Sequence, residues 1–71
     1  IIKGNVSIEE VNTTLKIQLP EKKDYTTLSG LFIYFFGKFP KQNSRLNIEN
    51  TCLIVKKMGK RKIDEIRLII M

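Results

Sequence analysis

The most apolar segment of the chain lies between Asp24 and Pro40, and it limits how the protein can fold. This segment, DYTTLSGLFIYFFGKFP, contains all four phenylalanines and both tyrosines. Its apolar residues point in nearly every direction around a helix, and such a helix must be buried on more than one side. Core packing explains the aromatic stripe better than a cofactor site or a membrane segment, because buried aromatic residues dominate core energetics. The sequence therefore predicts a central core helix.

Both ends of this helix carry residues that favour helix termini. Asp24, Thr26 and Thr27 each offer a side-chain oxygen to the unpaired N–H groups of a first turn. Gly37 can take the left-handed conformation that ends a helix.

Gly30 lies inside the helix, where glycine costs roughly 0.5 to 1 kcal/mol relative to alanine. We therefore expect the first helix or a strand to approach the chain closely at Gly30.

Length and residue types restrict the class of protein. The 71 residues are enough for one small domain, positions 1–71, and the start at Ile1 suggests a domain cut from a longer protein. The apolar run Leu31–Phe36 has six residues, whereas a membrane-spanning helix needs roughly 20. Cys52 is the sole cysteine and there is no histidine. We therefore expect no disulfide, no metal site, no bound cofactor, and a reducing compartment.

Hydrophobic periodicity divides the rest of the chain into short elements. Ser7 and Glu10 have the spacing of a capping box, and a first helix is expected over about Ile8–Leu15. The expected strands are Ile1–Gly4, Arg45–Glu49, Cys52–Lys57 and Lys62–Met71, with turns at Asn50–Thr51 and Met58–Arg61. The sequence thus predicts an α+β fold in the order β-α-α-β-β-β. Two helices should pack on one face of a small, mainly antiparallel four-stranded sheet.

The last strand contains an irregularity. Its apolar residues are Ile63, Ile66, Leu68 and Ile70. Ile63 differs in parity from the other three, and side chains alternate between the two faces of a strand. All four can reach the core only if the phase slips, so we expect a β-bulge around Asp64 and Glu65.

Charge is the most prominent compositional feature. Thirteen Lys and Arg stand against seven acidic residues, which gives a formal net charge of +6. Such an excess can indicate nucleic acid or an anionic membrane surface as partner. The one concentration flanks Gly59, and we call it the basic tip: Lys56, Lys57, Lys60, Arg61 and Lys62. A solvated turn explains it most simply, and a partner surface or phosphate binding are the functional alternatives.

Catalysis has the weakest support. Without histidine, no nucleophile, base and orienting group stand at a recognisable spacing. Cys52 has no basic partner that would generate a thiolate, so we expect it to pack as a small apolar residue. The adjacent Glu9 and Glu10 are explained by helix capping and solvation. We therefore assign no catalytic residues and do not expect an enzyme.

Short motifs follow one another along the whole chain. They are I-x-G-x-x-x-I-x-E at Ile2–Glu10, V-N-x-x-L at Val11–Leu15, L-P at Leu19–Pro20, D-Y-x-T-L-S-G at Asp24–Gly30, G-K-F-P at Gly37–Pro40, and the strand residues Leu53, Val55, Arg61, Lys62, Ile63, Ile66, Arg67 and Leu68. In this order and spacing they resemble the CorC/HlyC transporter-associated domain. Two positions depart from the family pattern: Asn43 stands at a glycine position and Lys62 at an arginine position.

The resemblance implies a location and a role. Such domains lie at the C-terminal end of membrane proteins that carry a transmembrane domain and a pair of CBS domains. Those proteins are hemolysin-like and associated with magnesium and cobalt efflux. The resemblance implies a non-catalytic, cytoplasmic regulatory or interaction domain, the soluble C-terminal part of an inner-membrane protein. The implied partners are the CBS or membrane domain of the parent protein, or a second copy in a homodimer.

Two further hypotheses concern the partner. A small basic nucleic-acid-binding module is disfavoured, because stacking platforms need aromatic residues on an exposed sheet face and here every aromatic residue lies in or beside the central helix. At the basic tip, an anionic membrane surface would attract positive charge in general, whereas a protein partner would use Arg61 in a directional carboxylate contact. The protein partner is favoured, since regulation requires a contact that differs between states.

Overall fold

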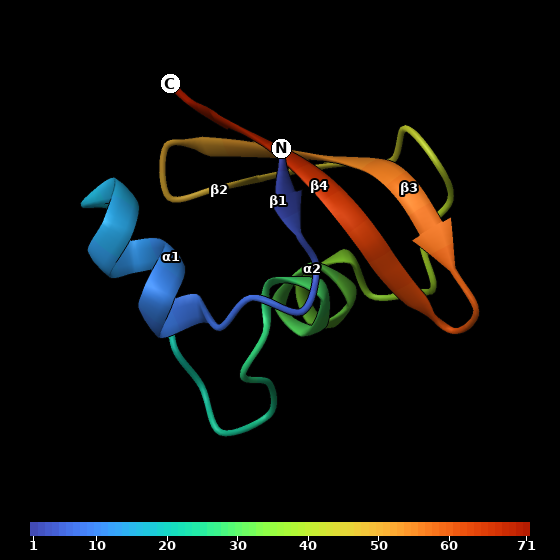
Figure 1. Cartoon of the computed structure of the whole chain (residues 1–71), viewed down its shortest axis with the longest axis horizontal. Coiled ribbons are helices and arrows are strands. Elements are labelled where there is room, and N and C mark those ends of the chain that lie inside the picture. Colours follow the sequence, from blue (N-terminus) through green and yellow to red (C-terminus); the bar gives the residue numbers. More distant parts are fainter.

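The elements follow one another in the order expected from the sequence. A computed structural model describes residues 1–71. The elements are β1 (Ile2–Lys3), α1 (Ile8–Leu15), α2 (Leu28–Phe36), β2 (Arg45–Ile48), β3 (Thr51–Gly59) and β4 (Lys62–Ile70). Figure 1 shows the sheet with both helices on one side of it. The α+β class and the packing of both helices on one face are therefore confirmed.

The strands form one sheet in the order β1-β4-β3-β2, and every neighbouring pair is antiparallel. β3 and β4 make the long central hairpin, which β1 and β2 flank (Figure 1). Glu49 and Asn50, both with positive φ, join β2 to β3, and Lys60 and Arg61 join β3 to β4. Both expected turns are thus slightly misplaced, because cross-strand pairing begins at Thr51 and continues to Gly59.

Helix α1 has the bounds expected from the sequence. The Ser7 hydroxyl accepts a hydrogen bond from the Glu10 N–H at 3.0 Å, which caps the helix start. The helix ends at Lys16, which takes the left-handed conformation with φ 56°. The Asn12 side chain then fixes the following segment, since it both donates to the carbonyl of Leu19 and accepts from its N–H, each at 2.9 Å.

Helix α2 is the central core helix. Thr27 caps it by accepting from the Gly30 N–H at 3.1 Å, and Gly37 ends it with φ 84°. Leu28, Leu31 and Phe32 of this helix are completely buried, whereas Tyr34 on the opposite side is 45% exposed. The close approach expected at Gly30 comes from Tyr25 in the preceding loop, whose Cβ would lie 3.0 Å from an added Cβ. The expectation of a helix or strand there is wrong. Neither helix is long and apolar enough to cross a membrane.

The core lies between the two helices and the inner face of the sheet. It consists of Ile8, Val11, Leu19, Tyr25, Leu28, Leu31, Phe32, Leu53, Val55, Ile63 and Ile66. Every element except the short outer strands β1 and β2 contributes a buried residue, while Ile2, Leu46 and Ile48 of those strands pack at its border. The two layers are therefore joined by one continuous apolar cluster.

The β3–β4 hairpin contains the register change that the sequence predicts. Lys56 on β3 and Asp64 on β4 are each left out of the cross-strand pairing. The slip allows both Ile63 and Ile66 to point into the core, where they are 1% and 0% exposed. Ile70 does not reach the core and is 56% exposed. The expectation for this residue is wrong because the end of β4 lies away from both helices (Figure 1).

Candidate functional site

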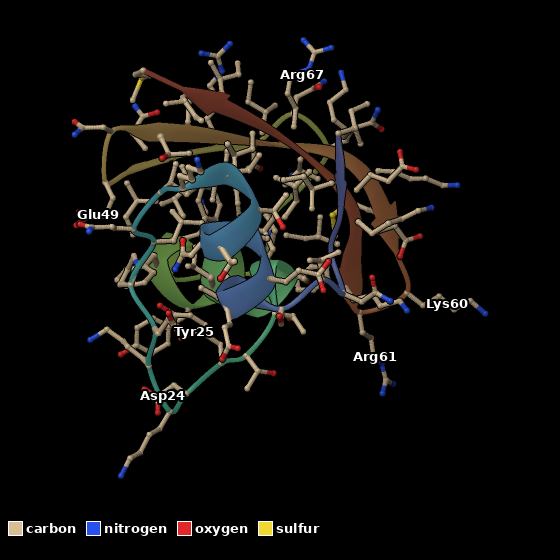
Figure 2. The ribbon with its side chains drawn as sticks, turned by 60° about the vertical axis from the view of Figure 1, so that its left-hand side comes forward. Asp24, Tyr25, Glu49, Lys60, Arg61 and Arg67 are labelled. Atoms are coloured by element: carbon tan, nitrogen blue, oxygen red, sulfur yellow. The ribbon has the colours of Figure 1, made fainter.

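The basic tip occupies one end of the β3–β4 hairpin. Lys56 and Lys57 lie near the end of β3, Lys60 and Arg61 form the turn, and Lys62 begins β4. All are exposed except Lys56, which is partly buried at the bulge. Figure 2 shows Lys60 and Arg61 extending from the end of the hairpin. The structure thus brings the five predicted residues into one region.

Backbone geometry makes this end of the hairpin tight. Arg61 has φ 62°, a left-handed conformation that costs an ordinary residue roughly 1 to 2 kcal/mol. At Gly59 an added Cβ would lie 2.5 Å from Oδ1 of Asp64. The absence of a side chain at Gly59 therefore lets the bulged Asp64 carboxylate lie across the hairpin.

Some residues of the basic tip have acidic side chains beside them and others do not. Lys57 and Lys62 line a shallow depression together with Lys3, Asn5, Ile63, Asp64 and Glu65. The molecule has a single ion pair, between Nζ of Lys3 and Oε2 of Glu65 at 3.7 Å. Lys60 and Arg61 on the turn lie outside this depression. They are the two members of the tip most available to an acidic partner.

The start of α2 is not available to an anionic ligand. A helix N-terminus binds phosphate through its unpaired N–H groups. Here the N–H of Leu28 donates to the Val6 carbonyl at 3.0 Å, and that of Ser29 to the Gly4 carbonyl at 2.9 Å. The next N–H, that of Gly30, donates to the Thr27 side chain. The protein itself therefore fills the positions that a phosphate would need.

Other reactive side chains are built into the packing. Cys52 is a free thiol, 6% exposed. Tyr25 is buried and its hydroxyl donates to the Pro20 carbonyl. Burial, with smaller contributions from the nearby Tyr34, Asp24 and Glu21, raises the pKa of the Tyr25 hydroxyl above its usual value. No three His, Cys, Asp or Glu side chains gather in a way that could hold a metal ion.

Two arginines that sequence reasoning did not group lie on one row across the sheet. Arg67 on β4 pairs with Ile54 on β3, and Ile54 pairs with Arg45 on β2. Strand alternation could have assigned each arginine to the solvent side. Their alignment depends on the register of three strands and on the bulge, which local sequence does not give.

Comparison of the whole sequence with known families identifies the family of this chain. Residues 1–71 match the family model of the transporter associated domain CorC_HlyC. The chain belongs to the CorC/HlyC transporter-associated domain family. The resemblance found in the motifs is thereby confirmed. A search of curated proteins finds no significant match. Asn43, at the family's glycine position, has φ 72°, so asparagine here adopts the left-handed conformation that glycine favours.

Solved structures of CorC/HlyC domains share this fold. A transporter associated domain from Nitrosomonas europaea aligns with a TM-score of 0.89 at 21% identity, covering 99% of this chain and 84% of the other. A hemolysin domain from Xylella fastidiosa, in complex with Mg²⁺ and Mn²⁺, gives 0.85 at 24% identity, with 99% and 84% coverage. A region associated with a Mg²⁺ and Co²⁺ transporter (CorC) of Neisseria meningitidis gives 0.89 at 20% identity, with 99% and 85% coverage.

Proposed function

We propose that this CorC/HlyC domain is a non-catalytic regulatory module at the cytoplasmic, C-terminal end of a longer inner-membrane protein involved in magnesium or cobalt efflux. The observation that carries the proposal is the family match across residues 1–71. The structural neighbour from Neisseria meningitidis, described as a CorC-associated region, supports the same context. Cys52 and Tyr25 are both buried, so neither the thiol nor the phenol is exposed to a substrate.

The basic tip is the proposed contact. Its partner would be the CBS or membrane domain of the parent protein, or a second copy of this domain in a homodimer. A domain can bias a transporter between two states only if its contacts differ between those states. Lys60 and Arg61 suit this task, because they extend from the hairpin end and have no acidic neighbour within ion-pair distance (Figure 2).

A protein partner and an anionic lipid surface place different demands on the tip. Lipid attracts each basic residue by about 1 kcal/mol near the surface, largely irrespective of geometry. A carboxylate of a protein can form a bidentate contact with Arg61, and lysine cannot reproduce it. We favour the protein partner, since a diffuse lipid attraction changes little with conformation.

Ion efflux by the full-length protein tests the proposal. Reversal of all five tip charges to glutamate should change the efflux rate about fivefold or more, the lower end of ordinary allosteric coupling. Arg61→Lys alone should produce much of this effect, because it removes the bidentate contact and keeps the charge. The matched control reverses five exposed lysines elsewhere, Lys16, Lys22, Lys23, Lys38 and Lys41, and should leave efflux nearly unchanged.

Two results would contradict the proposal. Efflux that is indifferent to the five-residue reversal would leave the basic tip as a solvated turn. An effect of the five-residue reversal without any effect of Arg61→Lys would assign the tip to an anionic membrane surface. Thermal unfolding of each variant shows that the fold is intact before efflux is compared.

A further inference from the structure

The face of the sheet opposite the helices carries a second basic surface. Leu53 and Val55 on β3 are completely buried beneath the helices, so Ile54 between them points to the other face. Its cross-strand neighbours Arg45 and Arg67 share that face. Figure 2 shows Arg67 projecting from β4 on the side away from the helices. We call Arg45, Ile54 and Arg67 the arginine row.

The arginine row has no internal counter-charge. The sole ion pair of the molecule joins Lys3 and Glu65, and neither Arg45 nor Arg67 takes part in one. The acidic residues Asp64 and Glu65 of β4 lie toward the basic tip, where they line one depression with Lys3 and Lys57. The face is therefore positively charged around the arginine row, and an acidic partner is the electrostatic complement.

The same face has an apolar centre. Ile54 is partly buried between the two arginines, and Ile69, two residues after Arg67 on β4, is 42% exposed. Strands lie about 4.8 Å apart, so Arg45 and Arg67, separated by one strand, stand about 10 Å apart. This spacing matches the width of an α-helix, about 10 to 12 Å with its side chains.

We propose that this face binds an acidic amphipathic helix of a protein partner. The apolar stripe of the helix would lie on Ile54 and Ile69, and carboxylates on its two flanks would accept hydrogen bonds from the guanidinium groups of Arg45 and Arg67. Arginine forms such contacts bidentately, which fixes the orientation of the helix. The inference rests on the proposed role as a docking domain, but it does not depend on ion transport or on the basic tip.

An NMR titration of the ¹⁵N-labelled 71-residue chain tests this inference. The probe is a synthetic helix of about 18 residues with a leucine stripe flanked by glutamates, long enough to be helical in water. Its control peptide carries lysine at every glutamate position. The acidic peptide should shift the amides of Arg45, Ile54, Arg67 and Ile69, and the lysine peptide should not. Anionic phosphatidylserine vesicles and single-stranded DNA are titrated in parallel.

Charge variants establish that the arginines are responsible. Arg45→Glu with Arg67→Glu should weaken binding of the acidic peptide about tenfold or more, as expected for loss of charge-assisted hydrogen bonds. Lys23→Glu with Lys41→Glu makes the same charge change at exposed residues of the loops around α2, and should alter affinity less than about twofold.

The inference is overturned if the acidic peptide causes no shifts on the arginine row, or shifts the basic tip alone. It is also overturned if both double variants weaken binding equally, because general charge would then explain the interaction. Vesicles or DNA that shift the row when the peptide does not would assign the face to another class of partner. None of these outcomes bears on ion efflux, so failure here is distinct from failure of the proposed function.

Discussion

At the scale of single residues, one buried serine ties three elements together. The Ser29 hydroxyl accepts a hydrogen bond from the Ile63 N–H of β4 at 3.1 Å, and its own N–H donates to the Gly4 carbonyl beside β1. Gly4 in turn donates to the Asp64 carbonyl at 2.8 Å. An added Cβ on Gly4 would lie 1.9 Å from the Ile63 carbonyl oxygen, so this crossing requires glycine.

Ser29→Ala should destabilise the domain by about 1 to 3 kcal/mol. The substitution leaves the buried Ile63 N–H without a partner, and a buried unsatisfied donor carries that penalty. The free energy of unfolding in urea measures the effect. Ser44→Ala is the matched control, because the Ser44 hydroxyl also accepts from a backbone N–H, that of Lys41, but at an exposed site. Equal losses in both variants would show that burial of the bond is unimportant.

Because of the buried Tyr25, the stability of the folded domain should decrease at alkaline pH. Burial raises the folded-state pKa of its hydroxyl above the unfolded value of about 10. As pH rises, the unfolded state therefore loses this proton first. The stabilisation is complete below about pH 10 and is lost as pH rises through the raised folded-state pKa.

Urea unfolding of the wild type and Tyr25→Phe between about pH 8 and pH 11 measures this loss. The variant lacks the hydroxyl and should lose less stability over this range, even if its stability at neutral pH is lower. Tyr34→Phe, at a position that is 45% exposed, should retain most of the wild-type pH dependence. Parallel curves for the wild type and Tyr25→Phe would contradict the assignment.

At the scale of elements, several ends and turns place ordinary residues in the left-handed conformation. Lys16 at the end of α1, Glu49 and Asn50 between β2 and β3, and Arg61 in the last hairpin all have positive φ. Only Asn50 is of a type that adopts it readily. These connections are imposed by the packing of the elements they join, at a local conformational cost.

Lys16→Gly should therefore stabilise the domain, by roughly 1 kcal/mol. Glycine removes the cost of the left-handed conformation at the C-terminus of α1, and the exposed Lys16 side chain makes no ion pair. The midpoint of thermal unfolding measures the gain. Lys41→Gly is the control at an exposed residue without positive φ, where glycine should be neutral or destabilising. A lower midpoint for Lys16→Gly would refute the explanation.

At the scale of the whole molecule, the two faces of the sheet have different properties. The inner face is completed by α1 and α2 and contains the core, whereas the outer face presents the arginine row to solvent. The basic tip lies at one end of the same sheet (Figure 2). Net charge of +6 with a single ion pair leaves both basic surfaces free for partners of opposite charge.

The fold class, the element order and α1 followed from the sequence because they depend on local features. Periodicity marked the helices, Ser7 and Gly37 marked helix ends, and the parity change at Ile63 required the bulge. The basic tip was also predictable, since its residues are close in sequence on either side of one turn. Its role in regulation stays a prediction.

Tertiary structure decided the features that depend on residues distant in the chain. Gly4, Ser29 and Ile63 come from three separate segments and meet at one junction, and no local sequence pattern predicts this contact. The exposure of Ile70 depended on how far the helices extend over the sheet. The approach of Tyr25 to Gly30 joins residues that are close in sequence, but it depended on the path of the loop before α2. The arginine row required the register of three strands. Sequence determines which way a side chain alternates, but only the paired sheet determines which side chains lie beside one another.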